Sequence, residues 1–328
     1  MMRKPGSARV AFTVALLGAA VALPQIVRNE YYLQVVTLAY IWAIATYGLN
    51  IILGFAGQLS LAHAGFFGVG AYTVGLLGTG AGVSFWIGLP AAVALSALAG
   101  YAVGSLCLRS KGHYFAIFTL AVGIIIHLVI QKWESLTHGP IGVIGIQGPT
   151  ALGPIDVGSS AARCYIVLAC LVVSIAVSVR IVHSSLGRRL MAVRESEALA
   201  ASVGIDVMRT KRTAFTLSAA FAGLAGALYA GYIGYLGPEV ASVEVTFNTL
   251  LYLMVGGLGT ISGPLIGTFI VYGLSQILQV LQDYQMIVFG AALVLLIVFM
   301  PGGLAGAVRR AQHRAGPAPV ARVVEEAW

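Results

Sequence analysis

The chain has 328 residues, of which 59% are hydrophobic and only 9% are charged. A soluble domain carries about 25% charged residues, so this composition excludes an ordinary soluble enzyme. The apolar runs are long and do not alternate with polar residues, which favours membrane-spanning helices over a barrel. The three cysteines lack metal-ligand spacing and the net charge of +8 is spread over several loops. We therefore predict no disulfide, no metal site and no nucleic-acid binding.

The apolar runs predict an all-α polytopic membrane protein with about ten transmembrane helices. The first run, residues 10–27, is short enough for a signal peptide, but a second long run follows it directly, which favours a retained helix. Residues 246–255 are too short to cross alone at about 1.5 Å per residue. They either cross together with upstream residues from about 240 or form a broken or re-entrant element. The other helices are predicted at about residues 33–53, from the glycine-rich stretch 53–72 to 77, and at 85–108, 114–130, 165–182, 213–235, 264–281 and 284–300.

The basic residues predict the orientation in the membrane. With ten crossings, only Arg28, Lys132 and Arg163 of the 19 Lys and Arg residues fall on the external side. This bias is what the positive-inside rule expects when both the N-terminus and the C-terminus are cytoplasmic. We predict a single transmembrane domain over residues 1–304, followed by a flexible basic cytoplasmic tail over residues 305–328.

The glycine-rich stretch of residues 53–72 contains five glycines and three neutral polar side chains but no charge. Glycines in such apolar sequence indicate close backbone packing or a helix interrupted beside a solute pathway, and the pattern leaves both interpretations open. Residues 256–263 loosely repeat its spacing, which suggests an internal repeat whose two copies enter from the same side. We predict that the translocation path lies at or near Asn50, Gln58, Ser60, His63, Thr260 and Ser262.

The acidic residues bear on the energy source. All eleven Asp and Glu residues fall in predicted loops, helix ends or the tail, whereas ion-coupled transporters usually keep ionisable groups within the membrane. This weakens ion coupling, but sodium bound by carbonyl groups and a passive channel both stay open. The chain also lacks a G-x-x-x-x-G-K-[ST] phosphate loop, so it is not expected to be an ATPase or another enzyme. If transport is active, its energy comes from another subunit.

One long polar segment, residues 183–212, lies in the second half of the chain and is called the connecting segment below. A capping serine at Ser184 or Ser185, and Gly204 as a stop, predict one short helix over residues 190–203 on the cytoplasmic face. The segment is either a docking element for a partner or a solvated loop anchored to anionic lipid. The residues predicted to be exposed for partner contacts are Arg188, Arg189, Arg194, Glu195 and Glu197.

Three motifs of the chain are similar to those of a known family. They read YGLNIILGFAGQLSLAHAGFFGVGAY from Tyr47, SLGRRLMAVRESEALAASVGI from Ser185 and LMVGGLGTISGPLIGT from Leu253, and the segment that starts at His113 also matches. Together they resemble the permease subunits of branched-chain amino acid importers of the ATP-binding-cassette class. The resemblance covers about residues 47–303, and the order of the motifs suggests the larger of the family's two permease types.

The resemblance implies a multi-pass protein of the bacterial inner membrane with no cofactor and no catalytic or metal site. The implied partners are a second homologous permease, two cytoplasmic ATP-binding subunits, a periplasmic substrate-binding protein and membrane lipid. ATP binding would rock the two permeases between outward and inward access. The connecting segment corresponds to the coupling helix of the family, whose E-A-A…G signature is interrupted here at Leu199. The residues expected to couple to the ATPase are Gly187, Arg188, Arg189, Arg194, Glu195, Glu197, Ala201 and Gly204.

Two alternatives to the amino-acid importer stay open. Related permeases for urea and short amides are very similar to this chain, so the solute is the less specific part of the prediction. A stand-alone channel or ion-coupled carrier is the mechanistically different alternative. Uptake by the purified chain without ATPase partners would separate this alternative from an importer.

Overall fold

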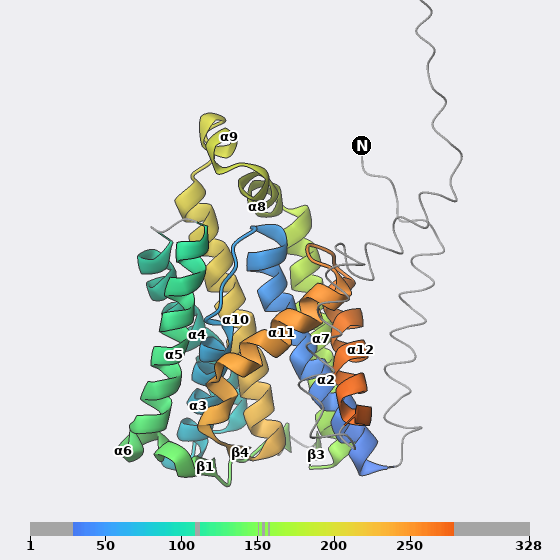
Figure 1. Cartoon of the computed structure of the whole chain (residues 1–328). Helices are drawn as coiled ribbons and strands as arrows, with labels where there is room; N and C mark the ends of the chain where they lie inside the picture. Colours follow the sequence, from blue (N-terminus) through green and yellow to red (C-terminus); the bar gives the residue numbers. More distant parts are fainter. Residues whose placement is uncertain (1–28, 109–111, 150, 153–154, 157, 279–328) are drawn as a thin grey trace, which may run out of the picture.

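The structure is a computed structural model that describes residues 29–108, 112–149, 151–152, 155–156 and 158–278 (Figure 1). The described chain is mostly helical, and six of its helices are long and apolar enough to span a membrane. This agrees with the expected polytopic membrane protein. The predicted first helix, the predicted helix at 284–300 and the tail at 305–328 lie outside the described residues. Ten crossings and cytoplasmic termini therefore stay predictions.

The six candidate spans lie where long apolar runs predicted helices. The largest difference is at α10, which begins six residues before the predicted start because Asp206 caps it by accepting a hydrogen bond from the Arg209 N–H (2.9 Å). The spans are α2 (Glu30–Leu49) with its continuation η1 (Asn50–Phe55), α3 (His63–Ala81), α4 (Phe85–Cys107), α5 (His113–Lys132), α7 (Ser160–His183) and α10 (Val207–Ile233).

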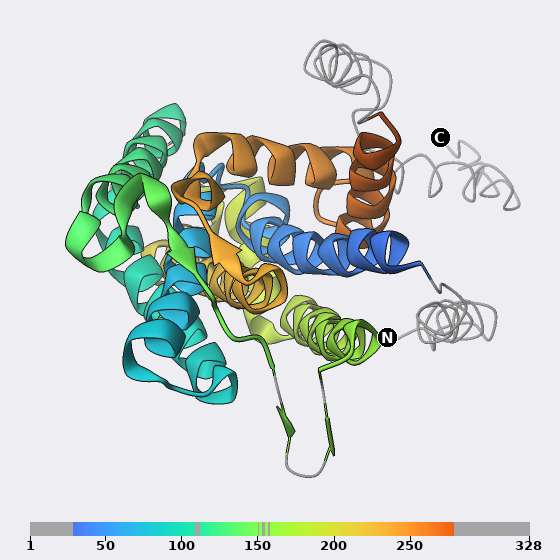
Figure 2. The ribbon, with the colours of Figure 1, turned by 90° about the horizontal axis from the view of Figure 1, so that it is seen from below.

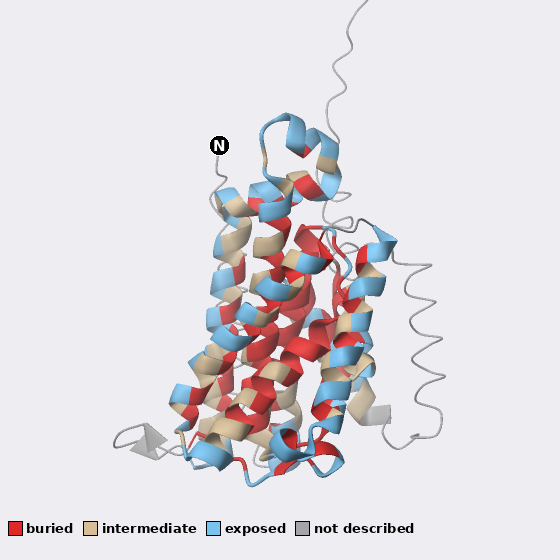
Figure 3. Ribbon diagram, turned by 90° about the vertical axis from the view of Figure 1, so that its left-hand side faces the viewer, coloured by how far each residue is buried: buried red, intermediate tan, exposed pale blue. Residues whose placement is uncertain are grey.

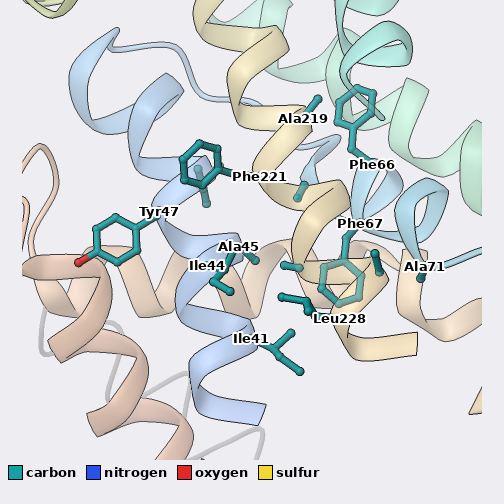
Figure 4. Close-up of a cluster of buried hydrophobic side chains, with 14 of the residues drawn as sticks. Ile41, Ile44, Ala45, Tyr47, Phe66, Phe67, Ala71, Ala219, Phe221 and Leu228 are labelled. Carbon is teal, nitrogen blue, oxygen red and sulfur yellow. The ribbon is translucent and has the colours of Figure 1, made fainter. Parts of the chain in front are cut away.

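The core of the bundle lies between α2, α3 and α10, and Figure 4 shows the large apolar side chains that meet there. Small residues allow these helices to pack closely. A methyl group on Gly70 of α3 would overlap the backbone of Gly223 on α10, and a side chain on Gly48 of α2 would come within 2.6 Å of the Cβ of Phe221. Buried residues accordingly concentrate on the inner helices, whereas outer faces are exposed (Figure 3).

The segment that was too short to cross alone is a broken element. The 3-10 helix η3 (Pro238–Ala241) and helix α11 (Val243–Gly256) are separated by Ser242, whose backbone is extended. Figure 1 shows α11 running obliquely across the bundle, and α12 (Gly263–Leu278) returning beside α2. The Tyr31 hydroxyl donates to Gln276 Oε1 (3.4 Å), so the start of α2 and the end of α12 lie at the same end.

Short elements cover this end of the bundle, which was predicted to be external and lies opposite α8 and α9 in Figure 1. Strand β1 (Val143–Ile144) pairs antiparallel with β4 (Tyr235–Leu236), which joins the loop after α5 to the end of α10. A separate antiparallel hairpin consists of β2 (Ala151–Leu152) and β3 (Ile155–Asp156), and it projects from the bundle in Figure 2. The remaining short elements are α6 (Glu134–Thr137) and η2 (Gly139–Ile141).

The connecting segment contains two helices, α8 (Ser185–Glu195) and α9 (Glu197–Ser202), so the prediction of one helix over residues 190–203 is wrong. Ser184 caps α8, as predicted, by accepting from the Leu186 N–H (3.1 Å). The break is at Ser196, whose backbone is extended and whose hydroxyl caps α9. Gly204 follows α9 with φ +83°, a conformation suited to glycine.

Candidate functional site

Two glycine turns meet at the end of the bundle that faces α8 and α9. They are residues 54–60, which follow η1, and residues 256–263, which join α11 to α12. The Asn50 side chain connects them, because its Nδ2 donates to the Thr260 carbonyl (2.8 Å) and its Oδ1 accepts from the Gly259 N–H (2.9 Å). A Cβ on Gly54 would lie 2.6 Å from Gly259 N. The two segments that the sequence suggested as a repeat therefore lie in direct contact.

A π-helix leads into the first turn. In η1 the Asn50 Oδ1 occupies the place that a side chain on Gly54 would need. The wider π-helix and the missing side chain of Gly54 together leave room for the Asn50 amide group. π-helical turns are frequent at functional sites. This local geometry explains why Asn50 and Gly54 are four residues apart, and it fixes where the helix ends.

The chain then enters the bundle as non-helical backbone, which is stable inside a membrane only where its polar groups find partners. The Gln58 N–H donates to the Ile52 carbonyl (3.0 Å). Two threonine hydroxyls from other helices satisfy the following residues. The Leu61 N–H donates to Thr119 Oγ1 of α5, and the Ala64 N–H donates to Thr246 Oγ1 of α11, both at 3.0 Å.

The predicted pathway residues other than Ser262 are buried: Asn50, Gln58, Ser60, His63 and Thr260. The His63 ring bonds to the Ala45 carbonyl through Nε2 (2.9 Å). Thr260 Oγ1 donates to the Gly257 carbonyl (2.8 Å) and accepts from the Gly263 N–H (3.0 Å). Ser262 is exposed at the start of α12. Their pathway role stays a prediction, but several of these side chains also hold helices and turns together.

The connecting segment contacts the glycine turns through two charged side chains. The Arg194 guanidinium donates to the Gly54 carbonyl and lies beside Gly259. Glu197 forms an ion pair with Lys211, whose side chain is only 3% exposed, and accepts a long hydrogen bond from Gln58 Nε2 (3.5 Å). Arg194 is exposed, as predicted, although its guanidinium also bonds to the first turn. Glu197 is half-buried and paired within the chain, which corrects the prediction that it is exposed for partner contacts. A buried ammonium group needs a paired counter-charge, and the break at Ser196 lets Glu197 supply it.

The outward side of the connecting segment carries the other predicted coupling residues. Arg188, Arg189, Glu195, Ala201 and Gly204 are exposed. Gly187 is instead buried against the carbonyl groups at the end of α7, where no Cβ fits.

The sequence did not single out four exposed apolar side chains of this segment, which are Met191, Leu199, Val203 and Met208. Leu199 and Val203 are 70% and 75% exposed. The interruption of the family signature at Leu199 was the available signal. A cavity of about 340 Å³ lies beside them, lined by Leu108, Glu197, Ala198, Ala201, Val207, Met208 and Lys211.

Helix α11 places an exposed acidic residue level with the middle of the bundle. The Thr246 hydroxyl donates to the Leu61 carbonyl (3.5 Å). A Cβ on Gly123, halfway along α5, would lie 3.1 Å from the same carbonyl oxygen. Glu244 is exposed in the first turn of α11. It precedes Thr246 by two residues, which is about 3 Å along the axis of α11. Glu244 lies at a helix end, as predicted, but this helix end is level with the middle of α5 rather than with the end of a spanning helix.

No group of three or more His, Cys, Asp or Glu residues that could hold a metal ion occurs in the described part of the chain. The polar groups near the glycine turns are amides, hydroxyls, the His63 imidazole, the Arg194 guanidinium and the paired Glu197 and Lys211. Such groups suit the binding of small polar solutes or the control of a passage.

Comparison with known proteins gives one consistent family. Residues 31–297 match the family described as branched-chain amino acid transport system / permease component. The chain is 33% identical over 315 residues to the high-affinity branched-chain amino acid transport system permease protein LivM of Escherichia coli K12. This alignment covers 89% of this chain and 74% of LivM. LivM of Salmonella typhimurium LT2 matches over the same extent. LivH of E. coli K12 is 24% identical over 300 residues, with 84% of this chain and 96% of LivH covered. No solved structure matches.

Proposed function

Because the chain belongs to the family of permease components of branched-chain amino acid transport systems, we propose that it imports branched-chain amino acids as a subunit of an ATP-driven transporter. The match over residues 31–297 carries this proposal, and 33% identity to LivM over most of the chain supports the larger permease type. The proposed location is the bacterial inner membrane. The proposed partners are a LivH-like permease, two ATP-binding subunits and a periplasmic binding protein.

The exposed side of the connecting segment is the proposed docking surface for an ATP-binding subunit. Its apolar residues, Leu199 and Val203, would be covered by the partner, and Arg188 and Arg189, which are exposed on α8, would add charge contacts. This surface is at the same end as the glycine turns, so a movement of the ATPase would reach the turns over a short distance.

Arg194 and Glu197 are the proposed mechanical link. Arg194 bonds to Gly54, and Glu197 connects Gln58 to Lys211 of α10. A shift of α8 and α9 would therefore displace both glycine turns, which meet through Asn50. The turns would act as the cytoplasmic gate, and the predicted pathway residues, Asn50, Gln58, Ser60, His63, Thr260 and Ser262, would line or close the inner end of the route.

Reconstitution tests the proposed function. Liposomes that contain this chain with its partner subunits should take up radiolabelled leucine only when ATP and the binding protein are present. Liposomes with this chain alone should show no uptake above the leak of empty vesicles. Uptake by the chain alone would establish a channel or carrier instead. ATP-driven uptake of urea or acetamide, but not leucine, would establish the alternative solute class.

Docking is tested by the double substitution of Leu199 and Val203 with Ser. The variant should fold normally, because both side chains are exposed, but should lose most of the co-purified ATP-binding subunit. Ile144→Ser is the matched control, since Ile144 is 69% exposed at the opposite end of the bundle. Normal co-purification of the double variant would contradict the docking assignment.

A further inference from the structure

The outward faces of three spanning helices are uniformly apolar. Between their ends, every exposed residue of α4, α5 and α7 is aliphatic or aromatic. These faces have the composition expected against lipid hydrocarbon. Their exposed residues are Ile87, Pro90, Ala94, Leu95, Leu98, Tyr101, Ala102 and Leu106 in α4; Tyr114, Ile117, Phe118, Ala121, Ile124, Ile125, Leu128 and Val129 in α5; and Ala169, Val172, Val173, Ala176 and Val177 in α7.

The outward face of α11 is different. Glu244 and Asn248 are both exposed and, four residues apart, lie on the same side of the helix, with Phe247 (52% exposed) beside them. Among the described residues, none forms an ion pair with the Glu244 carboxylate. Figure 2 shows that α11 lies at the outer edge of the bundle, so the described chain does not cover this face.

The depth of this face makes a lipid contact unfavourable. The bonds of Thr246 to Leu61 and Ala64 place α11 residues 244–248 level with the middle of α5. A charged side chain facing hydrocarbon at such a depth is costly, and such residues in membrane proteins face a cavity or a partner. The N-terminus of α11 favours the negative charge of Glu244 but does not provide it with a neutralising cation.

We propose that Glu244 and Asn248 form part of the amino-acid binding surface of the translocation path. This inference rests on the proposed function. An α-amino acid carries an ammonium group and a carboxylate, and the Glu244 carboxylate would bind the ammonium group while the Asn248 amide would donate to the carboxylate. Phe247 supplies apolar surface next to them, suited to a branched aliphatic side chain. The path then runs along the outer face of α11, between this chain and its partner permease.

The test compares Glu244→Gln, which removes the charge, with Glu244→Asp, which keeps it, in the reconstituted complex. The measured quantity is leucine taken up per ATP hydrolysed. Loss of a charge-assisted contact predicts a decrease of about 10-fold or more for Glu244→Gln, with ATPase stimulation by the binding protein preserved. Glu244→Asp should retain most of the coupling. Glu239→Gln is the matched control, because Glu239 is exposed in η3 at the external end.

A labelling experiment tests the same face independently of transport. A membrane-impermeant maleimide should react with Glu244→Cys in the assembled complex, and leucine with the binding protein and ATP should slow this reaction. Ile124→Cys should stay unreactive, because Ile124 is at the same depth, next to Gly123, on the apolar face of α5.

The outcomes separate the two proposals. Normal uptake per ATP by Glu244→Gln, or an equal loss in Glu239→Gln, would overturn the assignment to α11 while the importer itself stands. Loss of the partner permease on purification of Glu244→Gln would overturn it in favour of an interface ion pair. An unreactive Glu244→Cys would indicate a lipid-facing carboxyl group and also overturn it. If the wild-type complex shows no ATP-driven leucine uptake, the proposed function fails, and the amino-acid assignment fails with it.

Discussion

The polar groups at the two glycine turns are bonded within the chain, whereas those on the outer face of α11 are exposed. At the turns, Asn50 and Arg194 are bonded to backbone groups of the same chain. On α11, Glu244 and Asn248 are exposed, although the helix lies at the depth of the bundle centre. Within a membrane protein a polar group is costly unless it is paired. Paired groups therefore indicate a joint between elements, and exposed groups indicate a surface that receives something polar.

Breaking the ion pair beneath the connecting segment should have the largest effect on stability. Glu197→Ala leaves the Lys211 ammonium buried without a counter-charge, and we expect a loss of about 3 kcal/mol in the free energy of unfolding. Thermal unfolding of the detergent-solubilised chain measures it. Glu195→Ala is the control for stability, since Glu195 is exposed two residues away and should change the free energy by about 0.5 kcal/mol or less. Equal effects of both substitutions would contradict the pairing.

Removal of the amide that joins the turns should have the next largest effect. Asn50→Leu leaves the Gly259 N–H and the Thr260 carbonyl without their partner, which predicts a destabilisation of about 2 kcal/mol. Hydrogen exchange of the Gly259 amide, followed by mass spectrometry, should become faster, while exchange in the α3–α10 core should not. Unchanged protection of residues 256–263 would show that the amide does not hold the second turn.

The smallest of the three effects concerns the space between the turns. Gly54→Ala places a Cβ 2.6 Å from Gly259 N and should cost about 1 kcal/mol by overpacking. Gly80→Ala is the matched control, because nothing lies within 4 Å of a Cβ at this position near the end of α3. The control should be neutral or stabilising by up to about 1 kcal/mol. A Gly54→Ala variant as stable as Gly80→Ala would mean that the turns are not in contact.

Sequence reasoning located features that depend on neighbouring residues along the chain. The length of an apolar run decides whether a helix can span the membrane, and the Ser184 cap and the Gly204 stop depend on local hydrogen bonds and backbone conformation. The similar spacing of the two glycine turns suggested that both enter from the same side, but their direct contact was not predicted. These features are local, or are repeated in the sequence, and therefore leave a pattern in it.

Features that depend on packing between distant residues were harder to predict from the sequence. The residues around Ser196 are good helix formers, so propensity favoured one continuous helix, whereas pairing of Glu197 with Lys211 accompanies the break. The depth of Glu244 is set by bonds of Thr246 to α3 and its preceding loop. Such contacts join residues about 180 positions apart in sequence, and no pattern around Glu244 reports them.

The central claim is that the connecting segment controls the glycine turns through Arg194. The most direct measurement is leucine taken up per ATP hydrolysed by the reconstituted complex that carries Arg194→Met, which keeps the long apolar stem and removes the bond to Gly54. Arg212→Met is the control, because the Arg212 Cζ lies 4.9 Å from the centroid of the Tyr101 ring and, among the described residues, forms no bond with the turns.

We predict that Arg194→Met assembles with the ATP-binding subunits and hydrolyses ATP, but takes up about tenfold less leucine per ATP, a loss typical of one charge-assisted hydrogen bond. Arg212→Met should stay within about twofold of wild type, because an exposed cation–π contact contributes little. Wild-type coupling in Arg194→Met, with the complex intact, would contradict the account.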